Sequence, residues 1–352
     1  MDRRHFLSML GLGAVGLALP GVAQADILKQ AAANPNIKPI SGSWFEFQHP
    51  GGKEGVYWDK DLRQFTAAQW REKIREISET GMEYLVMMNV AAHGKAFFDT
   101  KLAPKFEMGC EDPIETVLSA ADEFGVKFFV SNDYWGPDLD AHRMMTDREL
   151  GKKRNQSMEE IYKKYGHHKS FYGWYFPNES WLDPYFCDFV IPYVNECAQV
   201  AKSLNANCVN IIAPYNIKKE KCDDYFVRQL EQLNVEIVAY QDGVGATRLE
   251  DSARYYENLS KAHQKAGRSR IWADMELFYF EQTTHGSLLP ADFNNRIIHQ
   301  MEAISPFVDK ILVYQYLGIM NKPQSKAHAG LRGETVRLYN QYMDWYNKQN
   351  FK

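Results

Sequence analysis

The stretch Phe171–Ser180, "FYGWYFPNES", carries the pattern that decides the fold. A run of aromatic residues, which favour β-strands, ends abruptly on Pro177, Asn178 and Glu179. We interpret Gly173–Glu179 as a buried strand that closes on an amide and a carboxylate side by side. Such an ending is expected where the C-terminal ends of parallel strands converge on a shared mouth.

Seven further runs of apolar, strand-favouring residues follow the same form, and segments with helical periodicity separate them. Strands that alternate with helices predict a parallel sheet, and eight such units in one domain predict an α/β fold, a (β/α)8 TIM barrel. An open doubly wound sheet is the alternative, although no GxGxxG follows the first run. The predicted strands are Gly42–Phe47, Glu83–Val90, Val126–Asp133, Gly173–Glu179, Cys208–Pro214, Glu236–Asp242, Ile271–Leu277 and Lys310–Tyr316.

Two of the intervening helices have clear boundary signals. Thr66 is a typical N-cap and Gly81 a typical stop for the first helix. Asp112 and Pro113 suit the cap and first turn of the next helix, which Gly125 ends. Similar periodicity predicts helices at residues 147–166, 183–204, 222–233, 250–266, 291–304 and 332–348.

The first 25 residues have the features of an export signal. Paired arginines, Arg3 and Arg4, precede an uncharged run that closes on Ala23-Gln24-Ala25, a small-x-small cleavage site. Four glycines and Pro20 interrupt the run, which argues against a spanning helix. We therefore predict a twin-arginine-type signal at 1–25, a leader at 26–39 and the barrel domain at 40–352. The mature protein is expected in the periplasm or outside the cell, without a membrane anchor.

Composition excludes several classes of partner. The net charge is −4, whereas a nucleic-acid-binding protein would present a basic face. The chain has five cysteines, an odd number, and no CxxC motif. The sequence therefore indicates neither a zinc knuckle nor a redox pair. No HExxH occurs, and the pair His167-His168 precedes the fourth strand, at the end opposite the mouth, where a surface or packing role is favoured. We predict no cofactor and no metal.

Polar side chains gather where the predicted strands end. A carboxylate in a partly dry site costs free energy unless it is paired or neutralised, so this concentration predicts a functional site. Aromatic residues near these ends would offer flat apolar faces to sugar rings. The polar candidates are Glu46, Asn89, Asp133, Asn178, Glu179, Asp242, Asp274 and Glu276, and the aromatic ones include Trp44, Trp135, Tyr215, Tyr240 and Tyr316.

Asn178-Glu179 on strand four, with Glu276 on strand seven, resembles the clan A (β/α)8 glycoside hydrolases. This resemblance implies that Glu179 is the general acid/base, that Glu276 is the nucleophile and that Asn178 binds the sugar 2-hydroxyl of a carbohydrate substrate. The whole mature chain is also similar to a largely uncharacterised family of secreted bacterial barrel proteins. In one departure from the clan pattern, Tyr314-Gln315-Tyr316 closes strand eight where a Trp is expected.

Several alternatives stay open at the level of sequence. Glu179 would also suit the first turn of a helix. Asp274 shares a strand face with Glu276 and is a rival nucleophile, and Asp242 would serve an enzyme of α-linked sugars. The alternative functions are a non-catalytic saccharide-binding barrel and a metal-assisted hydrolase or isomerase that uses His93, Asp133 and Glu179 or Asp242.

Overall fold

The structure is a computed structural model that describes residues 37–51, 53–136, 140–179, 181–244, 248–282, 286–349 and 351. The predicted signal at 1–25 and the leader up to residue 36 lie outside the described residues. In the part of the chain that the structure describes, no helix is both long and apolar enough to cross a membrane.

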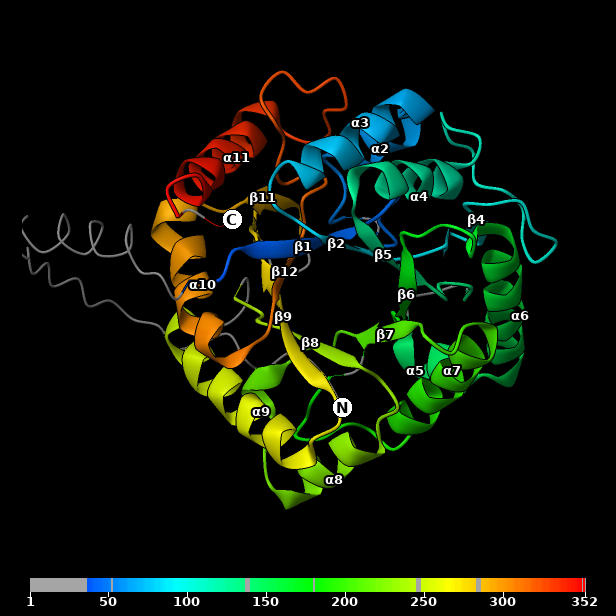
Figure 1. Ribbon diagram of the computed structural model, residues 1–352, viewed down its shortest axis with the longest axis vertical. Helices are drawn as coiled ribbons and strands as arrows, with labels where there is room; N and C mark the ends of the chain where they lie inside the picture. Colours follow the sequence, from blue (N-terminus) through cyan, green and yellow to red (C-terminus); the bar gives the residue numbers. More distant parts are fainter. Residues whose placement is uncertain are drawn as a thin grey trace, which may run out of the picture. The chain divides into compact units, whose positions relative to one another are not determined.

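Eight parallel strands form a closed barrel, and their order round the ring follows their order in the sequence. Figure 1 shows the helices on the outside of this ring. The predicted (β/α)8 barrel is therefore confirmed. All eight predicted strands are present, six of them shorter than predicted, while β1 and β9 have the predicted length but begin two residues and one residue earlier. The strands are β1 Ile40–Phe45, β2 Tyr84–Met87, β5 Lys127–Ser131, β6 Phe171–Tyr175, β7 Val209–Ile212, β8 Ile237–Gln241, β9 Arg270–Glu276 and β12 Ile311–Tyr314.

The outer helices begin where capping side chains stand in the sequence. Thr66 forms a capping box with Gln69, the side chain of Asp112 accepts a hydrogen bond from the backbone of Glu115, and Gly125 takes the left-handed conformation after its helix. The helices are α3 Ala67–Ser78, α4 Pro113–Phe124, α6 Arg148–Tyr165, α7 Val190–Leu204, α8 Asp224–Gln232, α9 Ser252–Ala266, α10 Ile298–Ile304 after a π turn at Phe293–Ile297, and α11 Arg332–Tyr346.

One predicted helix starts later than expected. The segment assigned to residues 183–204 becomes helical only at Val190, the first residue of α7. Before that point, the side chain of Gln229 in α8 donates to the backbone oxygen of Phe186 and accepts from its N–H. The backbone of Phe186 is therefore satisfied by a neighbouring helix instead of by helical hydrogen bonds of its own.

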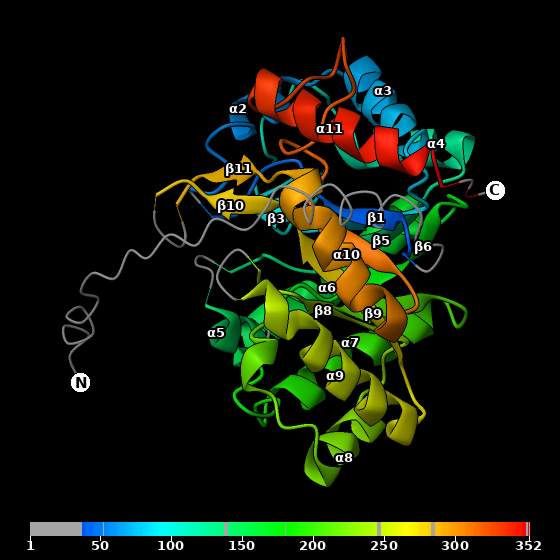
Figure 2. The same cartoon turned by 90° about the vertical axis from the view of Figure 1, so that its left-hand side faces the viewer.

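Additional short elements follow several strands at the C-terminal end of the barrel. Figure 2 shows the β10–β11 hairpin and helix α5 on the same side of the barrel. They extend the connections after β9 and β5, which predicts that they shape the mouth. The short elements are α2 Asp59–Gln64, β3 Ala91–Ala92, β4 Lys95–Ala96, α5 Ala141–Thr146, β10 Phe278–Phe280, β11 Leu288–Pro290, and the 3-10 turns η1 Ile217–Lys219 and η2 Leu249–Asp251. A further 3-10 turn, η4 Ser305–Phe307, follows α10 and precedes β12 at the opposite end of the barrel.

Large aromatic side chains fill the barrel interior. Trp44 and Tyr175 meet edge to face with ring centroids 5.8 Å apart, and Tyr84 and Trp272 do so at 5.1 Å. Gly173 is required in β6 because a Cβ there would lie 1.6 Å from the carbonyl oxygen of Val209 on the paired strand. Because the interior is a packed core, chemistry is confined to the mouth.

Candidate active site

Glu179 lies in the connection after β6 and is half-buried. Strand β6 ends at Tyr175, earlier than predicted, because Pro177 cannot donate to the ladder. Burial raises the pKa of Glu179 to about 7, the charge of Glu54 adds to this rise, and a hydrogen bond from Gln241 and the charge of His49 oppose it. This carboxyl group therefore exchanges its proton near neutral pH.

Asn178 is held in place by the carboxylate of Asp133. Asn178 Nδ2 donates to Asp133 Oδ2 at 2.8 Å and to the hydroxyl of Tyr193 at 3.0 Å. Arg154 Nη1 also donates to Asp133 Oδ2, at 3.0 Å, while Asp133 Oδ1 accepts two backbone N–H groups. Asp133, a predicted sugar ligand, thus acts as an anchor. The buried Oδ1 of Asn178 has no partner among the described residues and is available to accept from a ligand hydroxyl.

Strand β9 places Asp274 inside the barrel and Glu276 at its rim. Trp272 belongs to the interior core, and the two-residue period puts Asp274 on the same face, only 3% exposed. Burial, with the charges of Glu179, Asp242 and Glu276, raises the pKa of Asp274 well above its usual range. Burial thus favours the protonated form of Asp274, whereas Glu276 is half-exposed at the strand end.

Asp242, another predicted sugar ligand, supports the backbone of Glu276. Asp242 Oδ1 accepts from the N–H of Glu276 at 3.1 Å, and Asp242 Oδ2 accepts from Gln300 Nε2 at 2.7 Å. Gln300 Nε2 and Arg296 Nη2 in turn donate to the carbonyl oxygen of Glu276, at 3.1 and 2.9 Å. These bonds fix the position of the strand end, so Asp242 orients Glu276.

A buried group of charges lies beside Glu179 on the β1 side. Glu46 is fully buried, and its Oε1 accepts from Trp58 Nε1 at 2.7 Å and from Gln315 Nε2 at 2.8 Å. His49 Nδ1 lies 3.0 Å from Glu46 Oε2, and His49 Nε2 lies 3.3 Å from Glu54 Oε2. Burial lowers the pKa of His49, but the two carboxylates outweigh it and raise this pKa to about 10. His49 is therefore an imidazolium between two glutamates.

The Glu46–His49 pair gives a stability prediction. We expect Glu46→Ala to lower the free energy of unfolding by about 3–5 kcal/mol, because it leaves His49 and two donors buried without their acceptor. Urea unfolding at pH 6 measures this loss, and Glu54→Gln, at a half-exposed partner of the same His49, is the control with a smaller effect. Since the folded pKa of His49 is raised, the pair's contribution is complete below pH 6.5 and declines toward about pH 10. Equal stability of Glu46→Ala and wild type would contradict this assignment.

An aromatic pair borders Glu179 on the β7 side. Trp181 is 52% exposed, and its ring lies edge to face with Tyr215 at a centroid distance of 6.2 Å. Burial raises the pKa of Tyr215, and the charge of Glu179 adds to the rise, which places the phenol within electrostatic reach of that carboxyl. Tyr215 is therefore a predicted aromatic residue that lies next to Glu179.

Two of the predicted aromatic faces point away from the mouth. Ala239 belongs to the barrel interior, so Tyr240 on the same strand faces outward, where its hydroxyl lies 2.8 Å from Nε2 of His263 in α9. Lys73 Nζ of α3 lies over the ring of Tyr316, 5.4 Å from the ring centroid. These positions correct the prediction that Tyr240 and Tyr316 meet a saccharide.

Three further predicted residues take packing or loop-holding positions. Trp135 is buried and donates from Nε1 to Ser157 Oγ of α6 at 3.0 Å, and Trp44 is buried in the barrel core. Neither ring leaves an open face for a sugar. Asn89 Nδ2 donates to the carbonyl oxygens of Gln48 and Ala91, each at 3.2 Å, and so holds two loops together.

His49 and Glu54 neighbour the site without having been predicted from the sequence, and Tyr314, noted there only as a departure at strand eight, lies beside them. The hydroxyl of Tyr314 lies 3.0 Å from His49 Nδ1. The available signal was the position of His49, which follows the predicted first strand and stands three residues after Glu46 in a long glycine-rich connection. Its pairing with Glu54 depends on how that loop folds back, which sequence spacing does not specify.

Comparisons with known proteins agree with this architecture. A family model described as "Domain of unknown function (DUF4434)" matches residues 40–327. No curated protein matches the chain. An α-L-fucosidase candidate from Bacteroides thetaiotaomicron superposes with a TM-score of 0.72 at 16% identity, covering 89% of this chain and 96% of that one.

Two other solved structures are similar at lower scores. An endo-1,4-β-mannanase from Rhizomucor miehei has a TM-score of 0.53 at 11% identity and covers 85% of this chain and 95% of its own. A GH2 β-galacturonidase from Eisenbergiella tayi has a TM-score of 0.55 at 14% identity, with 88% of this chain and 51% of that one covered. At such identities these likenesses show the fold.

Proposed function

We propose, from the premise that this chain belongs to the family described as Domain of unknown function (DUF4434), that it is a glycoside hydrolase. The observation that carries the proposal is a half-buried Glu179 with a pKa of about 7 at the C-terminal mouth of a (β/α)8 barrel. A general acid for glycoside cleavage must keep its proton near neutral pH, and burial gives Glu179 that property.

In the proposed mechanism Glu179 and Glu276 act on opposite sides of one glycosidic bond. Glu179 donates its proton to the glycosidic oxygen while the carboxylate of Glu276 attacks the anomeric carbon, and the bond to the leaving alcohol breaks. Glu179, now ionised, then takes a proton from water, which attacks the same carbon and releases Glu276. This sequence retains the anomeric configuration.

The surrounding groups support this division of roles. Burial favours the protonated form of Asp274, which is a poor nucleophile, whereas Glu276 is half-exposed and its backbone is fixed by Asp242. The Oδ1 of Asn178, which has no partner within the described part of the chain, can accept from a sugar hydroxyl. The similar solved structures that carry a mannanase or galacturonidase name agree with a carbohydrate substrate, as an analogy of fold.

The proposal is tested by offering aryl glycosides and purified glycans to the protein, with and without a chelator. We expect release of the aglycone or of reducing ends at a rate that the chelator leaves unchanged, because no step uses a metal. Across the panel, absence of cleavage together with saturable binding of a glycan would support a different function.

That different function is a saccharide-binding barrel without catalysis, and the exposed ring of Trp181 beside Tyr215 favours it, since aromatic faces bind sugars without acid chemistry. The metal-assisted alternative has less support. His93 is exposed on its loop, and both oxygens of Asp133 already accept hydrogen bonds.

Export to the periplasm or beyond is part of the same proposal. It rests on Arg3, Arg4 and the small-x-small site at residues 23–25. Cell fractionation of the full chain tests it, and retention of the protein in the cytoplasm would argue against it.

A further inference from the structure

We propose that Glu115, His167 and His168 form a binding site for Zn²⁺ on the outer wall of the barrel, where the start of β6 meets helix α4. One ligand atom from each residue can be chosen so that all three lie within 4.8 Å of one another. The site is independent of the mouth, because His168 precedes β6 whereas Glu179 follows it. It does not depend on the proposed glycoside hydrolase activity.

The spacing of two of these ligand atoms already fits a tetrahedral metal. His168 Nε2 and Glu115 Oε2 lie 3.1 Å apart. Zinc bonds of about 2.0–2.1 Å to nitrogen and oxygen place two tetrahedral ligands roughly 3.3 Å from each other. A cation inserted between these atoms would therefore require little movement.

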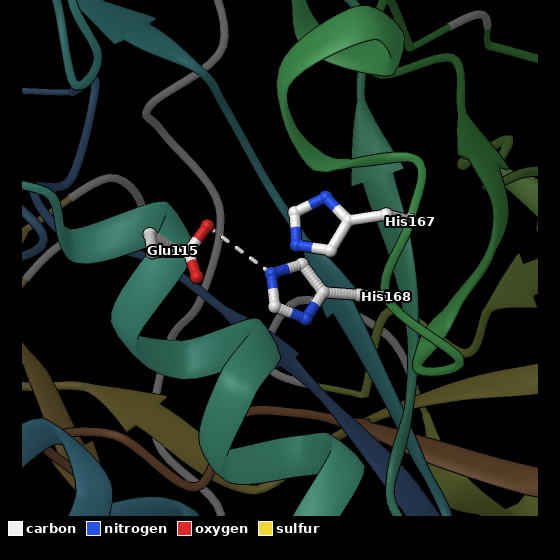
Figure 3. A group of neighbouring side chains, drawn as sticks. All are labelled: Glu115, His167 and His168. Carbon is white, nitrogen blue, oxygen red and sulfur yellow. Dashed lines mark hydrogen bonds and ion pairs between the residues drawn. The ribbon is translucent and has the colours of Figure 1, made fainter.

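His167 supplies the third ligand from the adjacent position in the chain. Its ring lies over that of His168 with centroids 4.1 Å apart, and Figure 3 shows the two imidazoles on the side of α4 that carries Glu115. His167 is exposed and Glu115 is half-exposed, so the imidazole can turn toward the metal and solvent can deliver it. A water molecule would complete four-coordination.

Asp122 gives the group the outer support that zinc-binding histidines typically have. Asp122 Oδ2 lies 2.7 Å from His168 Nδ1, and Asp122 Oδ1 accepts from the N–H of Ser170 at 2.6 Å. A carboxylate that accepts a hydrogen bond from Nδ1–H leaves the Nε2 lone pair for the metal and fixes the ring. His168 is buried between Asp122 and Glu115, so its ring orientation is determined before any metal arrives.

The ligand set selects the ion by its chemistry. Two imidazole nitrogens with one carboxylate oxygen and an open position suit Zn²⁺, whereas Mg²⁺ and Ca²⁺ prefer oxygen ligands. A bound ion would join α4, which carries Glu115, to the segment that leads into β6.

Isothermal titration of tag-free, chelator-stripped protein with ZnCl2 tests the proposal. We expect one Zn²⁺ per chain for wild type, at least about tenfold weaker binding for His167→Gln, and about 10- to 100-fold weaker binding for Asp122→Asn. His299→Gln is the matched control. In α10, His299 Nδ1 lies 3.8 Å from Glu302 Oε2, and no second histidine joins this pair among the described residues. This variant should bind Zn²⁺ as wild type does.

His167 is exposed, so its variant should fold, and a thermal melt verifies this. Zinc should raise the Tm of wild type and of His299→Gln but not that of His167→Gln, by preferential binding to the folded state. Absence of zinc binding by wild type, or wild-type affinity in a folded His167→Gln, would overturn the site. Either result leaves the glycan-cleavage assay unaffected, so the two proposals fail separately.

Discussion

Glu179→Gln should lower kcat/KM on a cleavable glycoside by about 10²- to 10⁴-fold, the range typical of a lost general acid or base. Glutamine has nearly the shape of glutamate. Its side-chain oxygen can still accept the hydrogen bond from Gln241. The variant therefore keeps the fold and the saccharide site but has no proton to give. Initial rates over a range of substrate concentrations measure the loss, and the substrate KM should change far less than kcat.

The pH dependence of kcat/KM in the wild-type protein is a second test of the acid role of Glu179. Because Glu179 works in its protonated form and has a raised pKa of about 7, kcat/KM should fall as the pH rises above that value. Glu54 contributes to the rise, so Glu54→Gln should move this decline to lower pH, by a few tenths of a unit, which is on the order of 0.5 kcal/mol.

Glu220 provides a matched control for Glu179. Its pKa is also raised to about 7 by burial, yet it lies near Arg254 and Asn258 of the outer helix α9. Glu220→Gln should leave kcat/KM unchanged. If Glu179→Gln retained wild-type turnover, or if both variants lost activity equally, Glu179 would lose the acid role.

Glu276→Ala should lower kcat by on the order of 10³-fold or more, since it removes the group that forms the covalent intermediate. The alanine leaves a space beside the anomeric carbon, and added azide should restore part of the turnover from that space. The product would be a glycosyl azide whose configuration is inverted relative to the substrate, because a single displacement replaces two. Product analysis by NMR measures this outcome.

Asp274 is the comparison for Glu276, because both lie on one face of β9. Asp274 is buried and its raised pKa favours the protonated form, so Asp274→Asn should retain most of the activity. Azide rescue of Asp274→Ala, with none for Glu276→Ala, would transfer the nucleophile role to Asp274. The two rescue experiments use the same substrate and conditions, so their responses to azide can be compared directly.

The barrel could be predicted from local sequence patterns because each of its units repeats the same signals for a strand and a helix. Short apolar runs, caps such as Thr66 and Asp112, and stops such as Gly125 are determined within a few residues of sequence. Gly173 adds a packing requirement, which the close approach of β7 explains. Sequence also predicted that Glu179 and Glu276 stand at strand ends.

The partners of those side chains were decided by contacts that are remote in sequence. Asp133 and Asp242 were predicted as sugar ligands. In the structure, Arg154 of α6 donates a hydrogen bond to Asp133, and Gln300 of α10 donates one to Asp242. Tyr240 was predicted as an aromatic residue at a strand end that meets the substrate. Its position along β8 instead directs its side chain outward, to His263 of α9.

The sequence by itself determined the ring of eight alternating units and which end of it carries the acids, because strand period and capping are local properties. Only the tertiary structure decided which acids are anchored and which hold a proton: the burial that raises the pKa of Glu179, and the loop that brings His49 between Glu46 and Glu54, arise from segments that meet only after folding.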